Sequence, residues 1–311
     1  MISERTQEAP RIYIAYHDMR PVLTGAHLIP IQVGRAIADF ILPGAEGDDT
    51  GANISALNPE YCELTAHYWA WKNTAHGGHV GLMHYRRLFD LAERMNPRGH
   101  SERYVLDFDS QSYRADVAGY FSNPDSAGID LVVPRPARLI RPILSQYRTH
   151  HRIDDFLVMR NVVAKRHPDF LPDLDRILHR NRFIMGNMFI MSGRVFEHYS
   201  RLLFDILDET RARIPDRPQP ETGYQRRYMG FLAERIMTAY VFGNHLRESF
   251  PDLGMAYRGI VNIDSSIPRK AGPLRLARYC LQRRLSLSDA LTAMKYGGSS
   301  DDSQSNGLRI R

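Results

Sequence analysis

Short runs of β-branched and aromatic residues alternate along this chain with longer segments of helical periodicity. Residues 11–16 (RIYIAY), 80–83 and 129–133 have the length and composition of strands. Helices are predicted over residues 60–73 and 153–166, because apolar positions recur there after polar or proline starts. Strands that alternate with helices predict an α/β layered fold with a largely parallel sheet.

The alternation continues in the second half of the chain. Residues 183–191 are predicted as a strand that Gly186-Asn187 interrupts, and helices are predicted over residues 195–211 and 230–241. Ligands of open α/β sheets bind beyond the carboxyl ends of the strands. The residues that follow each strand are therefore the first candidates for a site.

Composition agrees with a folded protein of one large or two small domains, since 43% of the 311 residues are apolar and 24% are charged. Two cysteines are too few for a disulfide framework, and the polar N-terminus lacks the apolar region of a secretory signal. No apolar run has the length needed to cross a bilayer. We therefore expect a cytoplasmic protein that is not an integral membrane protein.

Charge is concentrated at the C-terminal end. Residues 268–311 hold nine basic and three acidic residues, an excess equal to the net charge of +6 of the whole chain. The preceding part is balanced, so the basic pI of 9.3 does not indicate a nucleic-acid-binding fold. We predict a polar extension at 1–10, a folded α/β domain at 11–266 and a basic helical tail at 267–311 with a disordered end.

The tail allows two interpretations. Its arginines and leucines can hold the protein on the anionic inner face of the plasma membrane. Packing of a C-terminal helix onto the domain explains the leucines between 274 and 285 equally well.

Two polar motifs are candidates for a ligand site. In Gly47-Asp48-Asp49-Thr50-Gly51, adjacent carboxylates can hold a ribose, a sugar hydroxyl or a divalent cation, whereas the structural alternative is an Asx-type capping turn. In His84-Tyr85-Arg86-Arg87, cations follow a strand and can grip a diphosphate. The alternative for Arg86 is a surface turn paired with a neighbouring acid.

Three further features lie within predicted elements. Gly186-Asn187 indicates either a bulge or a close approach of backbone to ligand. His150-His151 lacks the spacing of a helical zinc site, so we expect its polar cluster to start a helix. Glu234 has no basic partner three or four residues away, and burial would suit it to act as a general base, while a tertiary pair with an arginine is the alternative.

The strings IPIQVGRA, GDDTGANIS, NPEYCELTAHYWAWKN, GLMHYRRLF, GNMFIM and GFLAERI, taken in order, resemble a bacterial family known as DUF4422. Its members are associated with capsular and exopolysaccharide synthesis. The resemblance covers about residues 11–250. It implies a GT-A-like, Rossmann-related glycosyltransferase fold, and some relatives are galactofuranosyltransferases.

The resemblance also assigns roles to residues. It implies that Tyr13 and His17 lie near the nucleotide base and that Asp48, Asp49 and Asn53 line the donor pocket. Relatives often carry another acid at the position of Ala52, so metal chelation by this loop is not favoured. Two more roles come from the later motifs: Asn187 would face the sugar, and Glu234 would be the general base.

In many GT-A enzymes the strand that corresponds to residues 80–83 ends in an Asp-x-Asp metal motif. Here the same place reads His84-Tyr85-Arg86. Cations in place of carboxylates remove the ligands of Mg²⁺ or Mn²⁺ but still neutralise a leaving diphosphate. We therefore expect catalysis that requires no cofactor, with a divalent cation left as the alternative.

The predicted reaction is an inverting transfer from a UDP-sugar, for which UDP-galactofuranose is a candidate, to a glycan or lipid-linked glycan acceptor. Glu234 accepts the proton of the acceptor hydroxyl, and Arg86, Arg87 and His84 absorb the charge of the departing diphosphate. The alternative is a non-catalytic subunit that binds a nucleotide sugar or glycan in a polysaccharide assembly complex. Nucleic acid is not an expected partner, because the basic tail lacks interleaved aromatic residues.

Overall fold

The computed structural model describes residues 8–95, 102–105, 108–214 and 223–263. The predicted basic tail and the domain boundary at 266 lie outside these residues. In the described part of the chain, no helix is long and apolar enough to span a membrane.

The described strands form one large mixed sheet and one small ladder. Seven strands follow the order β11-β7-β10-β4-β1-β2-β3, while β5, β6 and β12 extend the sheet beside β4. The strands of the large sheet are β1 (Arg11–Tyr16), β2 (Leu28–Gln32), β3 (Glu46–Gly47), β4 (His79–His84), β5 (Arg87–Phe89), β6 (Glu102–Val105), β7 (Leu131–Pro134), β10 (Phe189–Ser192), β11 (Met255–Arg258) and β12 (Ile260–Ile263). The ladder pairs β8 (Ala137–Arg138) with β9 (Arg182–Phe183).

Most neighbours in the sheet are parallel, which confirms the predicted α/β class. β1 runs parallel to both β2 and β4, and β7 runs parallel to β11. The exception along the main path is β10, which is antiparallel to β4 and β7. The strand predicted over 183–191 is therefore two short strands, β9 and β10, separated at Gly186 and Asn187.

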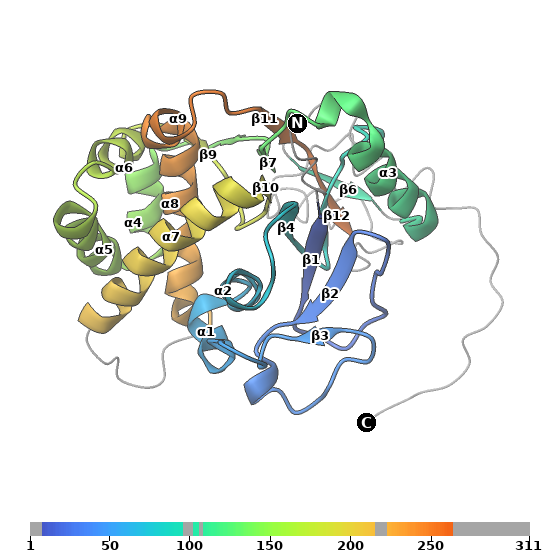
Figure 1. Ribbon diagram of the computed structural model, residues 1–311. Helices are drawn as coiled ribbons and strands as arrows, with labels where there is room; N and C mark the ends of the chain where they lie inside the picture. Colours follow the sequence, from blue (N-terminus) through green and yellow to red (C-terminus); the bar gives the residue numbers. More distant parts are fainter. Residues whose placement is uncertain (1–7, 96–101, 106–107, 215–222, 264–311) are drawn as a thin grey trace, which may run out of the picture.

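Helices cover both faces of the sheet. They are α1 (Asn58–Tyr61), α2 (Leu64–Asn73), α3 (Ser110–Ser122), α4 (Ile143–His150), α5 (Ile153–Arg166), α6 (Leu171–Leu178), α7 (Gly193–Arg213), α8 (Tyr228–Phe242) and α9 (His245–Ser249). In Figure 1, α4 to α8 gather on one side of the sheet and α3 lies on the other.

Alternation along β1 explains the two-sided core. Tyr13 and Ala15 pack into the apolar cluster that contains α2, α5, α7 and α8, whereas Ile12 and Ile14 pack into the cluster that contains α3. Strands buried on both faces are typical of α/β sheets, so the edge at the strand ends is where polar side chains can gather.

Candidate active site

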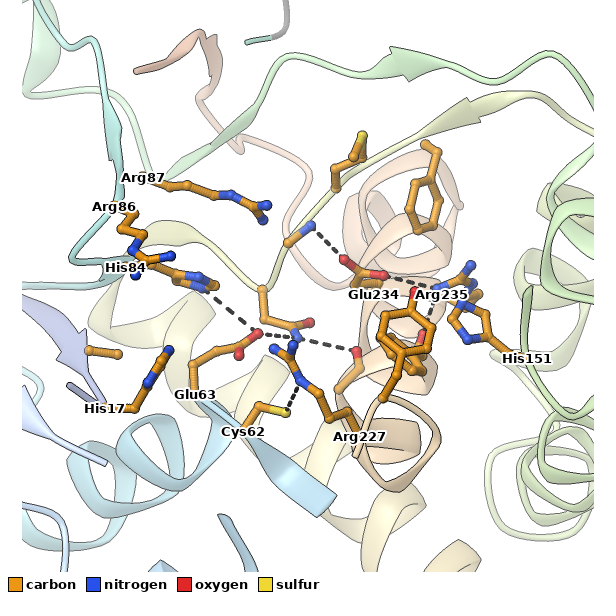
Figure 2. A pocket seen from close by; sticks show the side chains of 18 of the residues that line it. His17, Cys62, Glu63, His84, Arg86, Arg87, His151, Arg227, Glu234 and Arg235 are labelled. Carbon is orange, nitrogen blue, oxygen red and sulfur yellow. Dashed lines mark hydrogen bonds and ion pairs between the residues drawn. The ribbon is translucent and has the colours of Figure 1, made fainter. Parts of the chain in front are cut away.

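A cavity of about 1200 Å³ opens at the carboxyl ends of β1 and β4. These strands are parallel neighbours in which Ala15 pairs with His84, so the residues after both strands meet at one edge of the sheet. The facing wall comes from α8 and from the segment before β10. Figure 2 shows His17 and His84 on one side of the cavity and Glu234 with Arg235 on the other.

Two arginines follow β4 at its turn into β5. Arg86 is exposed, its Nη2 lies 3.8 Å from Asp18 Oδ2, and its guanidinium lies 5.0 Å from the centre of the Tyr85 ring. Arg87 extends into the cavity (Figure 2), and among the described residues its guanidinium has no hydrogen-bond or ion-pair partner. Arg86 thus adopts the paired alternative expected from the sequence, while Arg87 remains available to a ligand.

Glu63 brings to the cavity a carboxylate that the sequence did not single out. Its Oε1 accepts a hydrogen bond of 2.7 Å from Asn187 Nδ2 and lies 3.7 Å from His84 Nε2. Burial acts to raise the pKa of Glu63, but the His84 ring and the Asn187 hydrogen bond outweigh it and lower the pKa. Burial lowers the pKa of His84 despite the nearby Glu63. Glu63 and His84 thus form an electrostatically coupled pair at the cavity wall.

Asn187 connects this group to α8. The same Nδ2 that donates to Glu63 also donates to the Gly230 carbonyl oxygen at 3.2 Å. The Asn187 side chain is 3% exposed and lines the cavity. Its amide holds Glu63 at the cavity wall, and its predicted place facing the sugar stays a prediction.

Glu234 is held at both oxygens. Its Oε1 accepts from the Gly186 backbone N–H at 2.8 Å and its Oε2 accepts from Arg235 Nη1 at 2.9 Å. Burial raises the pKa of Glu234 more than Arg235 and the Gly186 N–H lower it, although the side chain is still 21% exposed toward the cavity. A carboxylate with a raised pKa beside a cavity suits a proton acceptor.

Gly186 owes its place to its backbone conformation. Its φ of 75° lies in the left-handed region, which glycine adopts without the steric cost that a Cβ brings. This turn separates β9 from β10 and aims the Gly186 N–H at Glu234. Gly186, which interrupts the strand predicted over 183–191, therefore donates a backbone hydrogen bond to the candidate base Glu234.

Arg235 is almost completely buried, at 1% exposure. Its guanidinium lies between the rings of Tyr147 and Phe183, with distances of 4.8 and 4.7 Å to their centres, and Nη2 donates to Gln146 Oε1 at 2.6 Å. These contacts fix Arg235, which in turn fixes Glu234. Glu234 is thus paired with an arginine, but with its neighbour in α8 and not through the tertiary pair that the sequence left open.

The helix predicted over 60–73 is wrong at its start. The chain forms α1 and α2 with a break at Cys62, whose φ of 53° is unusual for a residue with a side chain. Arg227 Nε donates to Cys62 Sγ at 3.1 Å, and burial raises the pKa of this thiol to about 12. Glu63 directly follows the break and lines the cavity with Cys62.

Aromatic rings line the cavity beyond Glu234. His151 lies 4.0 Å from Phe231 and 5.8 Å from Tyr224 between ring centres, and burial lowers its pKa to about 3. Neutral ring faces of this kind can contact the apolar face of a sugar. The polar cluster predicted as a helix start therefore contributes a cavity residue, His151.

Tyr13 lies outside the cavity, which corrects its predicted place near the nucleotide base. It is 1% exposed, packs in the core and meets the Trp69 ring edge-on at 6.0 Å. Its position in the middle of β1 points it into the helical layer. His17, two positions after Ala15, does line the cavity.

The predicted donor loop lies outside the cavity as well. Asp48 is fully buried and accepts hydrogen bonds from the backbone N–H groups of Gly34 and Arg35 and from the Ser55 hydroxyl. Asp49 Oδ1 lies 3.7 Å from Arg35 Nε, and Asn53 Nδ2 donates to the carbonyl oxygen of Asp49 within the loop. None of Asp48, Asp49 and Asn53 lines the cavity.

A metal site needs several His, Cys, Asp or Glu side chains that lie close together. In the residues that the structure describes, no three His, Cys, Asp or Glu side chains are grouped to hold a metal ion. The cavity carboxylates Glu63 and Glu234 each already accept hydrogen bonds from protein donors. Metal independence stays a prediction.

Several cavity residues escaped the sequence analysis: Glu63, Gln146, Arg227 and Arg235. Glu63 and Arg235 stand in strongly apolar helical segments, where a charged residue is itself a signal because burial without a partner is costly. Gln146 and Arg227 carry no comparable signal, since polar residues at helix surfaces are ordinary.

Comparison with known proteins gives one family model and one similar solved structure. The family model described as "Domain of unknown function (DUF4422)" matches residues 11–245. The solved structure of WbbM, a bifunctional glycosyltransferase in its apo form, is 28% identical in sequence with a TM-score of 0.71. That match covers 83% of this chain and 46% of the WbbM chain, so this chain spans about half the length of that protein. No curated protein matches the chain.

Proposed function

Since the chain belongs to the DUF4422 family, we propose that it is a glycosyltransferase that moves a sugar from a nucleoside-diphosphate donor to a glycan acceptor. The similar structure of a glycosyltransferase supports the reaction class. The observation that carries the proposal is the Arg87 guanidinium, which has no partner among the described residues and enters the same cavity as the partly buried carboxylate Glu234.

The diphosphate is proposed to bind at the arginine side of the cavity. Arg87 and Arg227 both line it, and the Arg227 Nε contacts only a protonated thiol among the described residues. Arg86 lies at the rim of the cavity. Its guanidinium gives up the 3.8 Å contact with Asp18 and binds a phosphate oxygen instead. Guanidinium groups recognise phosphate oxygens through parallel hydrogen bonds.

Glu234 is proposed as the base of a single displacement. An acceptor hydroxyl oxygen attacks the anomeric carbon, the bond from that carbon to the diphosphate oxygen breaks, and the diphosphate leaves with the bonding electrons. The hydroxyl proton moves to Glu234, whose hydrogen bonds from Gly186 and Arg235 keep its oxygens in place. Fixed cations stabilise the charge that develops on the diphosphate.

The finer assignments belong to this proposal. A uridine nucleotide, galactofuranose as the transferred sugar, inversion and a role in cell-surface polysaccharide synthesis follow from the family resemblance, with lipid-linked glycans among the acceptors. The basic tail on the inner face of the plasma membrane is part of the same proposal. A cavity of about 1200 Å³ is large enough for a nucleotide sugar together with an acceptor sugar.

The experiment measures binding and cleavage of a panel of UDP-sugars, including UDP-galactofuranose, with and without Mn²⁺ and with chelator. We expect one donor to raise the melting temperature and to release UDP slowly to water. Arg87→Ala should lower this release about 10²- to 10³-fold with an unchanged melting temperature of the free protein. Arg201→Ala is the control, because that exposed side chain pairs with Glu197 outside the cavity.

Two outcomes contradict the proposal. Tight donor binding without any release of UDP would indicate a non-catalytic binding subunit instead. Equal UDP release by Arg87→Ala and the wild-type protein would reject the diphosphate site.

A further inference from the structure

A cationic face lies on the exposed side of the β8–β9 ladder and reaches the edge of the active-site cavity, which Arg138 lines. Arg138 and Arg182 are directly opposite each other in this antiparallel pair, and both are exposed. Like charges at opposed positions repel and destabilise a ladder. An anionic partner outside the protein would relieve this repulsion.

The chain extends this face in both directions. Leu139 N–H donates to the Asn181 carbonyl oxygen at 2.7 Å, and Ile143 N–H donates to the Arg180 carbonyl oxygen at 2.8 Å. These bonds keep residues 139–143 beside residues 180–182. Exposed Arg141 and Arg180 therefore accompany the opposed pair.

An isoleucine projects from the same face. Leu139 is 5% exposed whereas Ile140 is 87% exposed, so the alternation along the extended segment points Ile140 outward with Arg138. A large aliphatic side chain this exposed gains free energy when a partner removes it from water.

The four arginines of this face are not neutralised by the protein. Within the described part of the chain, none of Arg138, Arg141, Arg180 and Arg182 forms an ion pair. Arg182 instead lies 5.2 Å from the centre of the Phe242 ring. Basic residues around an exposed aliphatic residue match a surface that carries anionic groups above an apolar layer.

We propose that this outer ladder face, formed by Arg138, Ile140, Arg141, Arg180 and Arg182, docks on an anionic phospholipid bilayer. The ladder also contributes to the cavity wall through Ala137, Arg138, Leu139 and Phe183, so Arg138 lies where this face meets the cavity. Docking would therefore bring the cavity close to the membrane surface. The proposal does not depend on transferase activity, because it concerns only how the protein is held.

The experiment uses flotation of the full chain with phosphatidylcholine vesicles that contain or lack phosphatidylglycerol. We expect the wild-type protein to float only with the anionic vesicles. Arg141→Glu/Arg182→Glu should weaken binding by about 30-fold or more, since each basic residue near such a surface contributes about fivefold. Ile140→Ser should weaken it by about tenfold.

The matched control is Arg114→Glu/Lys165→Glu, which changes net charge equally at exposed positions of α3 and α5. This variant should bind like the wild-type protein. Unchanged flotation of Arg141→Glu/Arg182→Glu would overturn the proposal, and so would equal losses in both double variants. Capture of the wild-type protein by a soluble polyanionic glycan but not by anionic vesicles would overturn it as well.

Discussion

Asp48 and the cavity carboxylates Glu63 and Glu234 lie near the same edge of the sheet but use their oxygens differently. Asp48 follows the short strand β3 and accepts hydrogen bonds from the backbone N–H groups of Gly34 and Arg35 and from the Ser55 hydroxyl. Glu63 and Glu234 also accept protein hydrogen bonds, yet both line the cavity. The comparison shows that a conspicuous acidic motif can serve the fold while isolated carboxylates of helical segments form the site.

The largest expected effect is that of Glu234→Gln. The amide keeps the shape of the side chain but accepts no proton, so turnover should fall about 10²- to 10⁴-fold. The measurement is sugar transfer or donor cleavage, with Glu209→Gln on α7 as a control outside the cavity. Loss of activity in the control or normal turnover in Glu234→Gln would remove Glu234 from its assigned role.

The pH dependence of the wild-type reaction tests the same residue. Burial raises the pKa of Glu234 above its usual value of 4.5. Because the base must be ionised, kcat/KM should fall as pH drops through this raised pKa. An acid limb at the ordinary carboxyl pKa would indicate that another group accepts the proton.

Glu63→Gln should have a smaller effect of two kinds. The negative charge of Glu63 contributes to the raised pKa of Glu234, so its removal should shift the acid limb to lower pH. Without Glu63, His84 is no longer held in place at the cavity wall. Turnover should therefore also fall about tenfold to a hundredfold. A lower turnover with an unmoved acid limb would mean that Glu63 has only a structural role.

Asp48→Ala should affect stability rather than chemistry. It leaves the Gly34 and Arg35 N–H groups and the Ser55 hydroxyl without their acceptor, at a cost of about 3 kcal/mol in the free energy of unfolding. A fall in Tm of about 5 to 10 °C follows for a chain of this size. Turnover per folded molecule, measured well below Tm, should stay near that of the wild-type protein.

The layered fold was predictable because its strands and helices carry strong local patterns. The strand at 11–16 and the helix at 153–166 appear with the predicted bounds. The antiparallel direction of β10 was not predictable, since pairing direction depends on contacts between β4, β7 and β10 that are distant in sequence.

The site was predictable only where it follows a strand. His84 and Arg87 were found because the end of β4 places them at the sheet edge. Glu63 was missed because its exposure to the cavity depends on the break at Cys62, which no local pattern indicates. The donor loop was overestimated because sequence cannot show that Asp48 is already saturated by Gly34, Arg35 and Ser55.

The smallest expected effect belongs to Asp49→Ala, which separates the two uses of a carboxylate most directly. Asp49 keeps only a 3.7 Å contact with Arg35 and is 30% exposed, so its removal should change the free energy of unfolding by about 0.5 kcal/mol or less. If the loop held the donor, the KM for the nucleotide sugar would rise sharply even though stability is unchanged. We expect an unchanged KM, because Asp49 lies outside the cavity and a side chain that does not contact the donor has no binding free energy to lose.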